Sequence, residues 1–198
     1  MNSFSAYLRQ FGTALRFLLL ATAVLGVIYP LAVWGVGQLA APSQANGSLV
    51  QVAGQPAASS LIAQSPEDGL GQKWFHPRPS AVSWNPLSSS ASNLGPNDPK
   101  LVEAISQLRQ QVAQTESVDA TQVPIDAVTA SGSGLDPQIS LAYAQLQVPR
   151  IAQATGVSQT ELQGLIKSRT TSGLESLLGQ ESVNVTLLNL DLAAKGVR

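Results

Sequence analysis

The chain of 198 residues contains no cysteine, a single histidine and few charged side chains, 11 basic and 12 acidic. Without cysteine it can form neither a disulfide nor a thiolate nucleophile, and one histidine excludes a metal site built from several imidazoles. With a formal net charge of −1, the sequence has no basic stripe that could bind nucleic acid. These absences exclude several large classes of enzyme and nucleic-acid-binding protein.

The motifs of common enzyme sites are missing as well. There is no GxxxxGK phosphate-binding loop, no GxGxxG turn after a strand and no GxSxG elbow around a serine nucleophile. His76 lies in a proline-dense loop, and we interpret it as a loop residue packed against Trp74 or Phe75, not as a catalytic base. The sequence predicts no catalytic residue and no metal site, and we expect the chain not to be an enzyme.

A long uncharged stretch is the most informative feature that is present. No charged side chain occurs between Arg16 and Glu67, and residues 17–41 are almost entirely apolar. As a helix this stretch would reach roughly 37 Å, more than the ~30 Å hydrocarbon core of a bilayer. We predict a short tail over residues 1–14, a transmembrane helix over residues 15–41 and one separate domain over residues 42–198.

Two alternatives to a retained membrane helix are a cleaved signal peptide and the core helix of a soluble domain. Signal peptides have a shorter apolar region, and a cut after Ala41 would place Leu39 and Pro42 at unfavourable positions. A buried core helix of this length would show a polar face. The length of the stretch favours the membrane helix over both.

Three residues within the apolar stretch affect how the helix could pack. Gly26 and Gly35 would let another helix approach closely, although glycines are also common in such helices. Pro30 removes a backbone donor in the middle of the span, which a neighbouring helix or a local bend can accommodate. We predict that Gly26, Pro30 and Gly35 belong to a packing face toward partner subunits.

The distribution of cations predicts the orientation of the helix. Arg9 and Arg16 precede the apolar stretch, whereas the first cation after it is Lys73. Because positive residues next to a span stay in the cytoplasm, we expect a cytoplasmic tail and an extracytoplasmic domain, which in a bacterium is periplasmic. The lack of cysteine is consistent with an oxidising compartment.

Residues 42–198 are long enough for one domain with a single core. Helices are expected after the start signal Asp98–Pro99, from about Ser140 with a break at Pro149, and after Ser158, which with a glutamate three residues on fits a capping box.

Strand signals are fewer. Val183, Val185 and Leu187 alternate with polar residues, which predicts a strand near the C-terminus. Residues 123–125, with proline in the middle, are expected to form an edge strand or a turn. We therefore predict an α+β domain with few strands and three to four helices.

A run of small residues fits two structures. Ser131, Gly132, Ser133 and Gly134 could form a backbone nest for an anion, or a turn before the next element. The pattern favours the turn and leaves the nest open.

An ordered series of short motifs is more specific. It contains FHPRPSA at residues 75–81, SNLGP at 92–96, VTASGSGLD at 128–136, VPRIA at 148–152, VNV at 183–185 and LNL at 188–190. Over essentially the whole chain this series resembles the C subunit of the bacterial Kdp potassium-transporting ATPase. The residues that carry the resemblance are Phe75, His76, Arg78, Pro79, Asn93, Leu94, Thr129, Ser131, Gly134, Leu135, Asp136, Pro149, Arg150, Asn184 and Asn189.

The resemblance implies a high-affinity potassium import complex in the cell inner membrane. In that family a channel-like A subunit selects potassium, a P-type B subunit hydrolyses ATP and a small F subunit stabilises the assembly. The C subunit is a membrane-anchored, non-catalytic accessory subunit, described as a catalytic chaperone that raises the ATP affinity of the B subunit. The resemblance thus implies the A, B and F subunits as partners, with ATP and potassium bound by them and no cofactor of the chain's own.

Two departures from the family pattern concern nucleotide binding. Relatives often carry Ser-Gly-Gly-Ser-Asn-Leu where this chain has SSASNL at residues 89–94, so two glycines that would ease the approach of backbone to phosphate are replaced. Many relatives have His after Leu-Asp-Pro, whereas this chain has Gln138. The candidate nucleotide-binding residues are therefore weak ones: Ser89, Ser92, Asn93, Ser131, Gly132, Ser133 and Gly134.

Two other functions stay open on the sequence. The chain could bind nucleotide directly as a regulator of the pump, which fits poorly with an extracytoplasmic domain because ATP is cytoplasmic. It could also be a stand-alone anchored periplasmic binding protein, which would need a ligand pocket and no obligate partner.

Overall fold

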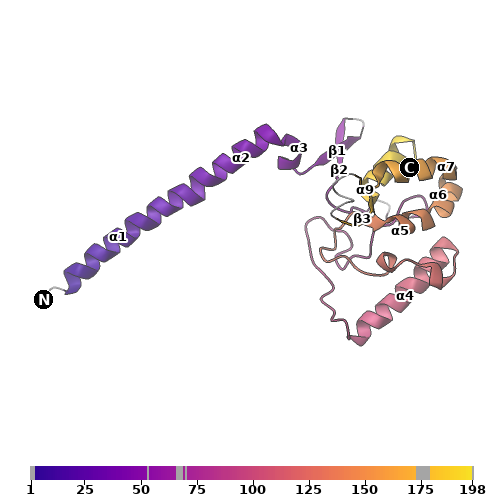
Figure 1. Cartoon of the computed structure of the whole chain (residues 1–198), viewed down its shortest axis with the longest axis horizontal. Coiled ribbons are helices and arrows are strands. Elements are labelled where there is room, and N and C mark those ends of the chain that lie inside the picture. The colour runs from indigo at the N-terminus through magenta and orange to yellow at the C-terminus, as the bar shows by residue number, and fades with distance from the viewer. Residues whose placement is uncertain (1–2, 53, 66–68, 70, 173–178, 198) are drawn as a thin grey trace. The chain divides into compact units, whose positions relative to one another are not determined.

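The computed structural model describes residues 3–52, 54–65, 69, 71–172 and 179–197. The chain divides into two compact units, Met1–Ser48 and Leu49–Arg198. The first unit consists of helices, and the second is a mixed domain of helices and short strands (Figure 1). The predicted α+β class and the single long apolar helix at the N-terminus are confirmed.

The first unit is dominated by one long helical segment, formed by α1 (Ser3–Ala23), a π-helical turn (Val24–Ile28) and α2 (Tyr29–Ala40). Over Phe4–Ala40 it is long and apolar enough to cross a membrane, and the most apolar part of it buries no residue within the chain. The single N-terminal apolar helix is therefore consistent with single-pass membrane anchoring.

The π turn lies directly before Pro30 and has a clear physical cause. Proline has no N–H, and its ring collides with the carbonyl four residues earlier in a regular α-helix. Here the N–H of Tyr29 bonds to the carbonyl of Val24, five residues back, which widens the turn just ahead of the ring. A local widening of the helix thus accompanies the proline, where the sequence predicted a neighbouring helix or a local bend.

The end of the first unit is a tight turn. After Ala41 leaves helical geometry, the short helix α3 (Pro42–Ala45) follows, and the side chain of Asn46 donates to the Gln38 side-chain oxygen at 3.1 Å.

The second unit contains two small antiparallel sheets of two strands each. β1 (Leu49–Val52) pairs with β2 (Gln55–Ser59), and β3 (Gln138–Ser140) pairs with β4 (Ser182–Asn184). The pairing of β3 with β4 joins segments more than forty residues apart and places Ile139 opposite Val183 in the core.

Helices of the second unit share one core with the β3–β4 pair. They are α4 (Pro99–Glu116), α5 (Leu141–Leu146), α6 (Val148–Thr155), α7 (Gln159–Arg169) and α9 (Val185–Ala194), with 3-10 turns at Ala120–Gln122 and Ile125–Ala127. Their buried side chains form one apolar core that includes Phe75, Ile139, Ile151, Leu162, Leu188 and Leu192.

Several local predictions can be compared with the structure. Asp98 caps α4 by accepting the Lys100 N–H at 2.9 Å, and the expected helix from Ser140 is divided into α5 and α6 just before Pro149. Residues 123 and 124 connect the two 3-10 segments and Ile125 begins the second, so this stretch is a turn, the second of the two alternatives, and not an edge strand.

The capping box after Ser158 forms only in part. The Ser158 hydroxyl accepts the Glu161 N–H at 3.2 Å and so caps α7. The Glu161 carboxylate, however, pairs with Lys195 of the C-terminal segment.

The strand predicted from Val183 to Leu187 is wrong beyond Asn184. The strand ends there because the Asn184 side-chain oxygen accepts the Leu187 N–H at 3.0 Å and caps helix α9. Val183 and Val185 are both buried as predicted, but Asn184 and Thr186 are buried as well and Leu187 is only half-buried, because the backbone turns from strand to helix after Asn184.

Candidate functional site

Two side-chain amides hold the loop that precedes the first long helix of the domain. Asn189 of α9 accepts the Phe75 N–H and donates to the Phe75 carbonyl, both at 2.9 Å. Gln147, between α5 and α6, accepts the His76 N–H at 2.6 Å and donates to the His76 carbonyl at 3.2 Å. Two consecutive residues thus have their backbone groups satisfied by side chains from other elements, as a neighbouring strand would satisfy them.

A buried ion pair lies beside these amides. The Arg150 Nε lies 3.0 and 2.9 Å from the two carboxylate oxygens of Glu116, with 5 % and 1 % of the side chains exposed. The remaining Arg150 nitrogens donate to the carbonyls of Gln72 at 2.6 Å and Trp74 at 3.1 Å, and to the Gln147 side-chain oxygen at 2.9 Å. One guanidinium therefore joins α4, α6 and the loop over residues 72–76.

The electrostatics of this cluster follow from burial. Burial raises the pKa of the Glu116 carboxyl, although the hydrogen bonds and the charge of Arg150 work against the rise. Burial and the nearby Arg150 charge lower the pKa of His76 to about 4, and the bond to the Gly71 carbonyl opposes this only in part. Because its pKa lies well below 7, His76 is neutral near pH 7. Burial, followed by the Glu116 charge, raises the pKa of the Tyr143 hydroxyl.

The motif loops over residues 78–90 and 129–136 pack together in a second cluster. Arg78 donates to the Thr129 carbonyl at 3.3 Å and pairs with Asp136 at 3.4 Å. The Ser80 hydroxyl donates to the Gly134 carbonyl at 2.7 Å, and the indole N–H of Trp84 donates to the Arg78 carbonyl at 3.1 Å.

Gly134 lies at the tightest point of this contact. Its φ is +71°, and a Cβ atom there would come within 2.6 Å of Val82 Cγ2 and 2.8 Å of the Ser90 carbonyl oxygen. Only glycine fits both the conformation and the space. A Cβ atom added to Gly132, two residues earlier, would have nothing within 4 Å.

The structure brings some of the weak nucleotide-binding candidates together. The Ser89 hydroxyl and the Ser90 N–H both donate to the Ser133 carbonyl, at 3.1 and 3.0 Å. The Ser131 N–H donates to the Pro79 carbonyl at 3.1 Å and the Gly134 N–H donates to the Ser131 carbonyl at 3.3 Å. Two backbone donors of the small-residue run, those of Ser131 and Gly134, are thus used within the domain, and anion binding by this run stays a prediction.

The other sequence candidates lie at different places. Ser92 is exposed, and Asn93 has a φ of +54° with its side chain bonded to the Ala91 carbonyl at 3.3 Å. Gln138 begins β3, and its side-chain oxygen is buried without a hydrogen-bond partner in the part of the chain that the structure describes. In the separate first unit, Gly26 lies inside the π turn and Gly35 has nothing within 4 Å of its Cβ position.

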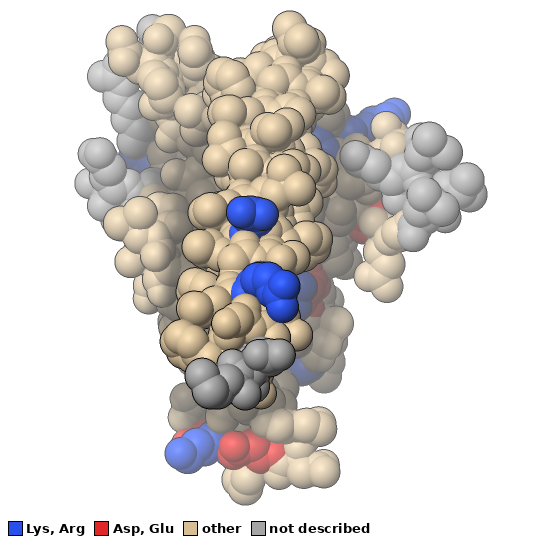
Figure 2. All heavy atoms as spheres, turned by 90° about the vertical axis from the view of Figure 1, so that its left-hand side faces the viewer, with Lys and Arg blue, Asp and Glu red and all other residues tan. Residues whose placement is uncertain are grey.

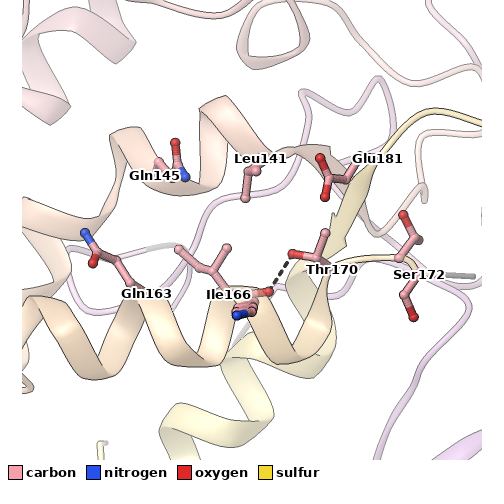
Figure 3. Close-up of a pocket in the computed structure, with 9 residues that line it drawn as sticks. Leu141, Gln145, Gln163, Ile166, Thr170, Ser172 and Glu181 are labelled. Atoms are coloured by element: carbon pink, nitrogen blue, oxygen red, sulfur yellow. Dashed lines mark hydrogen bonds between the residues drawn. The ribbon is translucent and has the colours of Figure 1, made fainter. Parts of the chain in front are cut away.

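Several cavities of the second unit are of a size for small molecules, and two of them lie beside elements described above. One, of about 430 Å³, has walls formed by α4, Tyr143 and the loop with His76 and Trp84, next to the ion pair. The other, of about 590 Å³, lies between α5 and α7, and Figure 3 shows Gln145, Gln163 and Glu181 around it. The Thr170 hydroxyl at the edge of this cavity donates a hydrogen bond to the Ile166 carbonyl at 2.8 Å. None of the residues singled out in the sequence faces this second cavity.

Within the described residues there is no group of three or more His, Asp or Glu side chains that could hold a metal ion. The polar residues that the fold gathers are used mainly to fix loops to helices. Sequence reasoning missed Glu116, Gln147 and Tyr143, because nothing in their local pattern shows that they meet Arg150 and His76 across the chain.

The two units together define a class of protein, a domain attached to an apolar helix suited to single-pass membrane anchoring. The family model described as KdpC, the c chain of the K+-transporting ATPase, matches residues 11–194.

Individual relatives agree with this match. The chain is 46 % identical over 187 residues to the potassium-transporting ATPase KdpC subunit of Kineococcus radiotolerans, covering 93 % of each chain. It is 44 % identical to the corresponding subunits of Mycobacterium bovis, over 93 % of this chain and 97 % of the relative, and of Cereibacter sphaeroides, over 92 % and 96 %. The chain belongs to the KdpC family of potassium-transporting ATPase subunits, and other Kdp subunits are therefore its implied partners.

Proposed function

We propose that the chain is the accessory C subunit of a high-affinity, ATP-driven potassium importer, anchored in the cell inner membrane by its N-terminal helix. Its partners are the channel-like A subunit, the ATP-hydrolysing B subunit and the small F subunit. The chain hydrolyses no ATP and carries no cofactor, and it stabilises the assembly and supports the B subunit.

The observation that carries the proposal is the asymmetry of charge about the apolar helix. Arg9 and Arg16 lie on its N-terminal side, whereas the next cation is Lys73. This asymmetry supports an N-terminus in the cytoplasm and a domain in the periplasm. A periplasmic domain supports the pump from the side at which potassium enters, and it does so without touching ATP.

Protease accessibility tests this orientation. Trypsin added to spheroplasts should digest the domain, and trypsin added to inside-out vesicles should leave it intact until detergent is added. A cytoplasmic protein serves as the control for vesicle integrity. Digestion only in inside-out vesicles would refute the proposed orientation.

A helix exchange tests the docking role. Replacing residues 1–41 with an unrelated single span of the same orientation should abolish copurification with the A and B subunits, while the domain stays in the membrane. Gly26→Leu and Gly35→Leu should weaken copurification if these residues face a partner. Stable assembly of the exchanged protein would show that the domain alone directs incorporation.

A direct nucleotide-binding role is the second candidate, supported by the fact that the two candidate segments, with Ser89 and Ser133, lie together, although the Ser89 hydroxyl already donates to the Ser133 carbonyl. It predicts that the purified chain binds ATP and that Ser89→Ala with Ser133→Ala weakens this binding. Absence of ATP binding together with a periplasmic domain would exclude it. A stand-alone binding protein is excluded if the chain copurifies with a large multi-span subunit.

A further inference from the structure

The N-terminal helical segment is longer than a bilayer requires. Phe4–Ala40 has 37 residues, which at about 1.5 Å per residue measure roughly 55 Å, against ~30 Å of hydrocarbon and 40–45 Å including both headgroup layers. The uncharged part that follows Arg16 is sufficient to span. Residues 4–16 must therefore lie at the headgroups or beyond them.

These residues have two unlike faces when placed at about 100° per residue around the helix. One face, the aromatic face, consists of Phe4, Tyr7, Leu8, Phe11 and Leu15. The opposite face, the arginine face, consists of Ser5, Arg9, Thr13 and Arg16. On the aromatic face, 73 % of Phe4, 67 % of Tyr7 and 66 % of Phe11 is exposed, so the described residues leave most of this face uncovered.

The arginine face carries positive charge, and residues 1–66 contain no acidic side chain to offset it. Arg9 and Arg16 are seven residues apart, so they lie on one side of the helix about 10 Å from each other, and Figure 2 shows two patches of basic side chains along the helix that faces the viewer. A shallow hollow of about 490 Å³ with Arg9, Gln10 and Thr13 on its wall runs beside this face.

We propose that residues 4–16 form a binding surface for anionic phospholipids, with the arginine face on the phosphates and the aromatic face on the upper acyl chains. Arginine matches phosphate oxygens with paired donors, and aromatic side chains prefer the boundary between headgroups and hydrocarbon. A helix tilt of roughly 40° would bring the whole 55 Å within the total bilayer thickness and separate the two faces in depth. The proposal rests on membrane anchoring and not on the orientation of the domain.

The lipid selectivity of the full chain tests whether the charges of Arg9 and Arg16 attract anionic phospholipids. In phosphatidylcholine vesicles, spin-labelled phosphatidylglycerol should associate with the protein up to about 25-fold more strongly than spin-labelled phosphatidylcholine, at about five-fold for each of the two arginines. Arg9→Gln with Arg16→Gln should remove most of this preference, and Arg9→Lys with Arg16→Lys should keep it. The matched control, Lys100→Gln with Lys167→Gln, removes two exposed cations of the second unit and should change nothing.

Undiminished selectivity in the Arg9→Gln, Arg16→Gln protein would refute the proposal. Resistance of each variant to alkaline extraction shows that it is still inserted, so that loss of anchoring is distinguished from loss of lipid selectivity.

Site-directed labels test the placement of the two faces, and the absence of native cysteine makes each label unique. Nitroxides at Gly12→Cys and Ala14→Cys are about 200° apart around the helix at nearly the same height. In the full chain the label at residue 14 should be accessible to oxygen in the membrane, and the label at residue 12 to a water-soluble relaxation agent. Equal exposure of both labels to water, or burial of residue 14 only when the other subunits are present, would overturn the proposal.

Discussion

Asn189 binds Phe75 as one residue of a strand binds its neighbour: the side-chain amide satisfies both the N–H and the carbonyl of Phe75, each at 2.9 Å. Phe75 itself is fully buried in the core. The amide therefore allows a loop without regular structure to place an aromatic side chain in the core without leaving buried backbone groups unsatisfied.

Asn189→Asp should destabilise the domain. It keeps the acceptor but replaces the donor with a carboxylate oxygen facing the Phe75 carbonyl. We expect a loss of about 1–3 kcal/mol in the free energy of unfolding at neutral pH, measured by urea denaturation of the chain in detergent. Gln163→Glu, the same chemical change on the exposed face of α7, should cost little. Equal effects would show that the Asn189 bonds are not needed.

Arg150→Gln should be one of the most destabilising single changes in the domain. It leaves the Glu116 carboxylate buried without its cation, which costs about 3–5 kcal/mol for buried pairs. The control is Arg169→Gln, which breaks a more exposed pair with Asp191 and should cost about 0–1 kcal/mol. Thermal unfolding of both variants measures the contrast, and similar midpoints would contradict a structural role for the buried pair.

Gly134→Ala should destabilise the packing of the two motif loops. The new methyl group would collide with Val82 and with the Ser90 carbonyl, and the positive φ adds strain. We expect the free energy of unfolding to fall by about 1–3 kcal/mol and proteases to cut more easily within residues 80–90. Gly132→Ala, with open space around it, should leave stability within about 0.5 kcal/mol. A tolerated Gly134→Ala would mean that these loops are not held together in solution.

His76 should make stability depend on pH. The pKa of His76 is about 4 in the folded chain and about 6.5 in the unfolded chain. Above pH 6.5 the side chain is therefore neutral in both states, and the domain keeps its full stability. As the pH falls from about 6.5 to about 4, the unfolded chain binds a proton at His76 and the folded chain does not. The free energy of unfolding therefore falls by up to about 1.4 kcal/mol per pH unit.

His76→Gln isolates this effect, because its stability should change less over the same pH window. The raised pKa of Glu116 acts in the opposite direction, adding stability as the pH falls. Because Glu116 is present in both proteins, its effect cancels to a first approximation when the two urea-denaturation curves are subtracted. Parallel pH profiles for the two proteins would show that His76 is not protected from protonation.

Local signals predicted much of the fold. Asp98 with Pro99 marks the start of α4, and Pro149 divides α5 from α6, because caps and prolines act on the backbone within one turn. Asn184 was misread because the alternation of buried valines continues through the change from strand to helix. There the side-chain cap, not the hydrophobic pattern, decides the backbone.

The polar cluster could not be predicted in the same way. Glu116 and Arg150 are 34 residues apart, and Phe75 and Asn189 are 114 apart. Such contacts depend on how the helices pack, and in the sequence these residues have no spacing that distinguishes them from ordinary surface residues. The family motifs did include Phe75, His76, Arg150 and Asn189, but without showing that they contact one another through one network.

The π turn at Val24–Ile28 has a consequence for any surface that follows the membrane helix. It contains one residue more than a regular turn, so side chains beyond Tyr29 are rotated by about 100° relative to a straight α-helix. A straight helix of another protein that packs along α1 would therefore contact a different face of the helical segment along α2. Deleting one residue there would bring the two halves back into phase and present a new stripe to the surroundings.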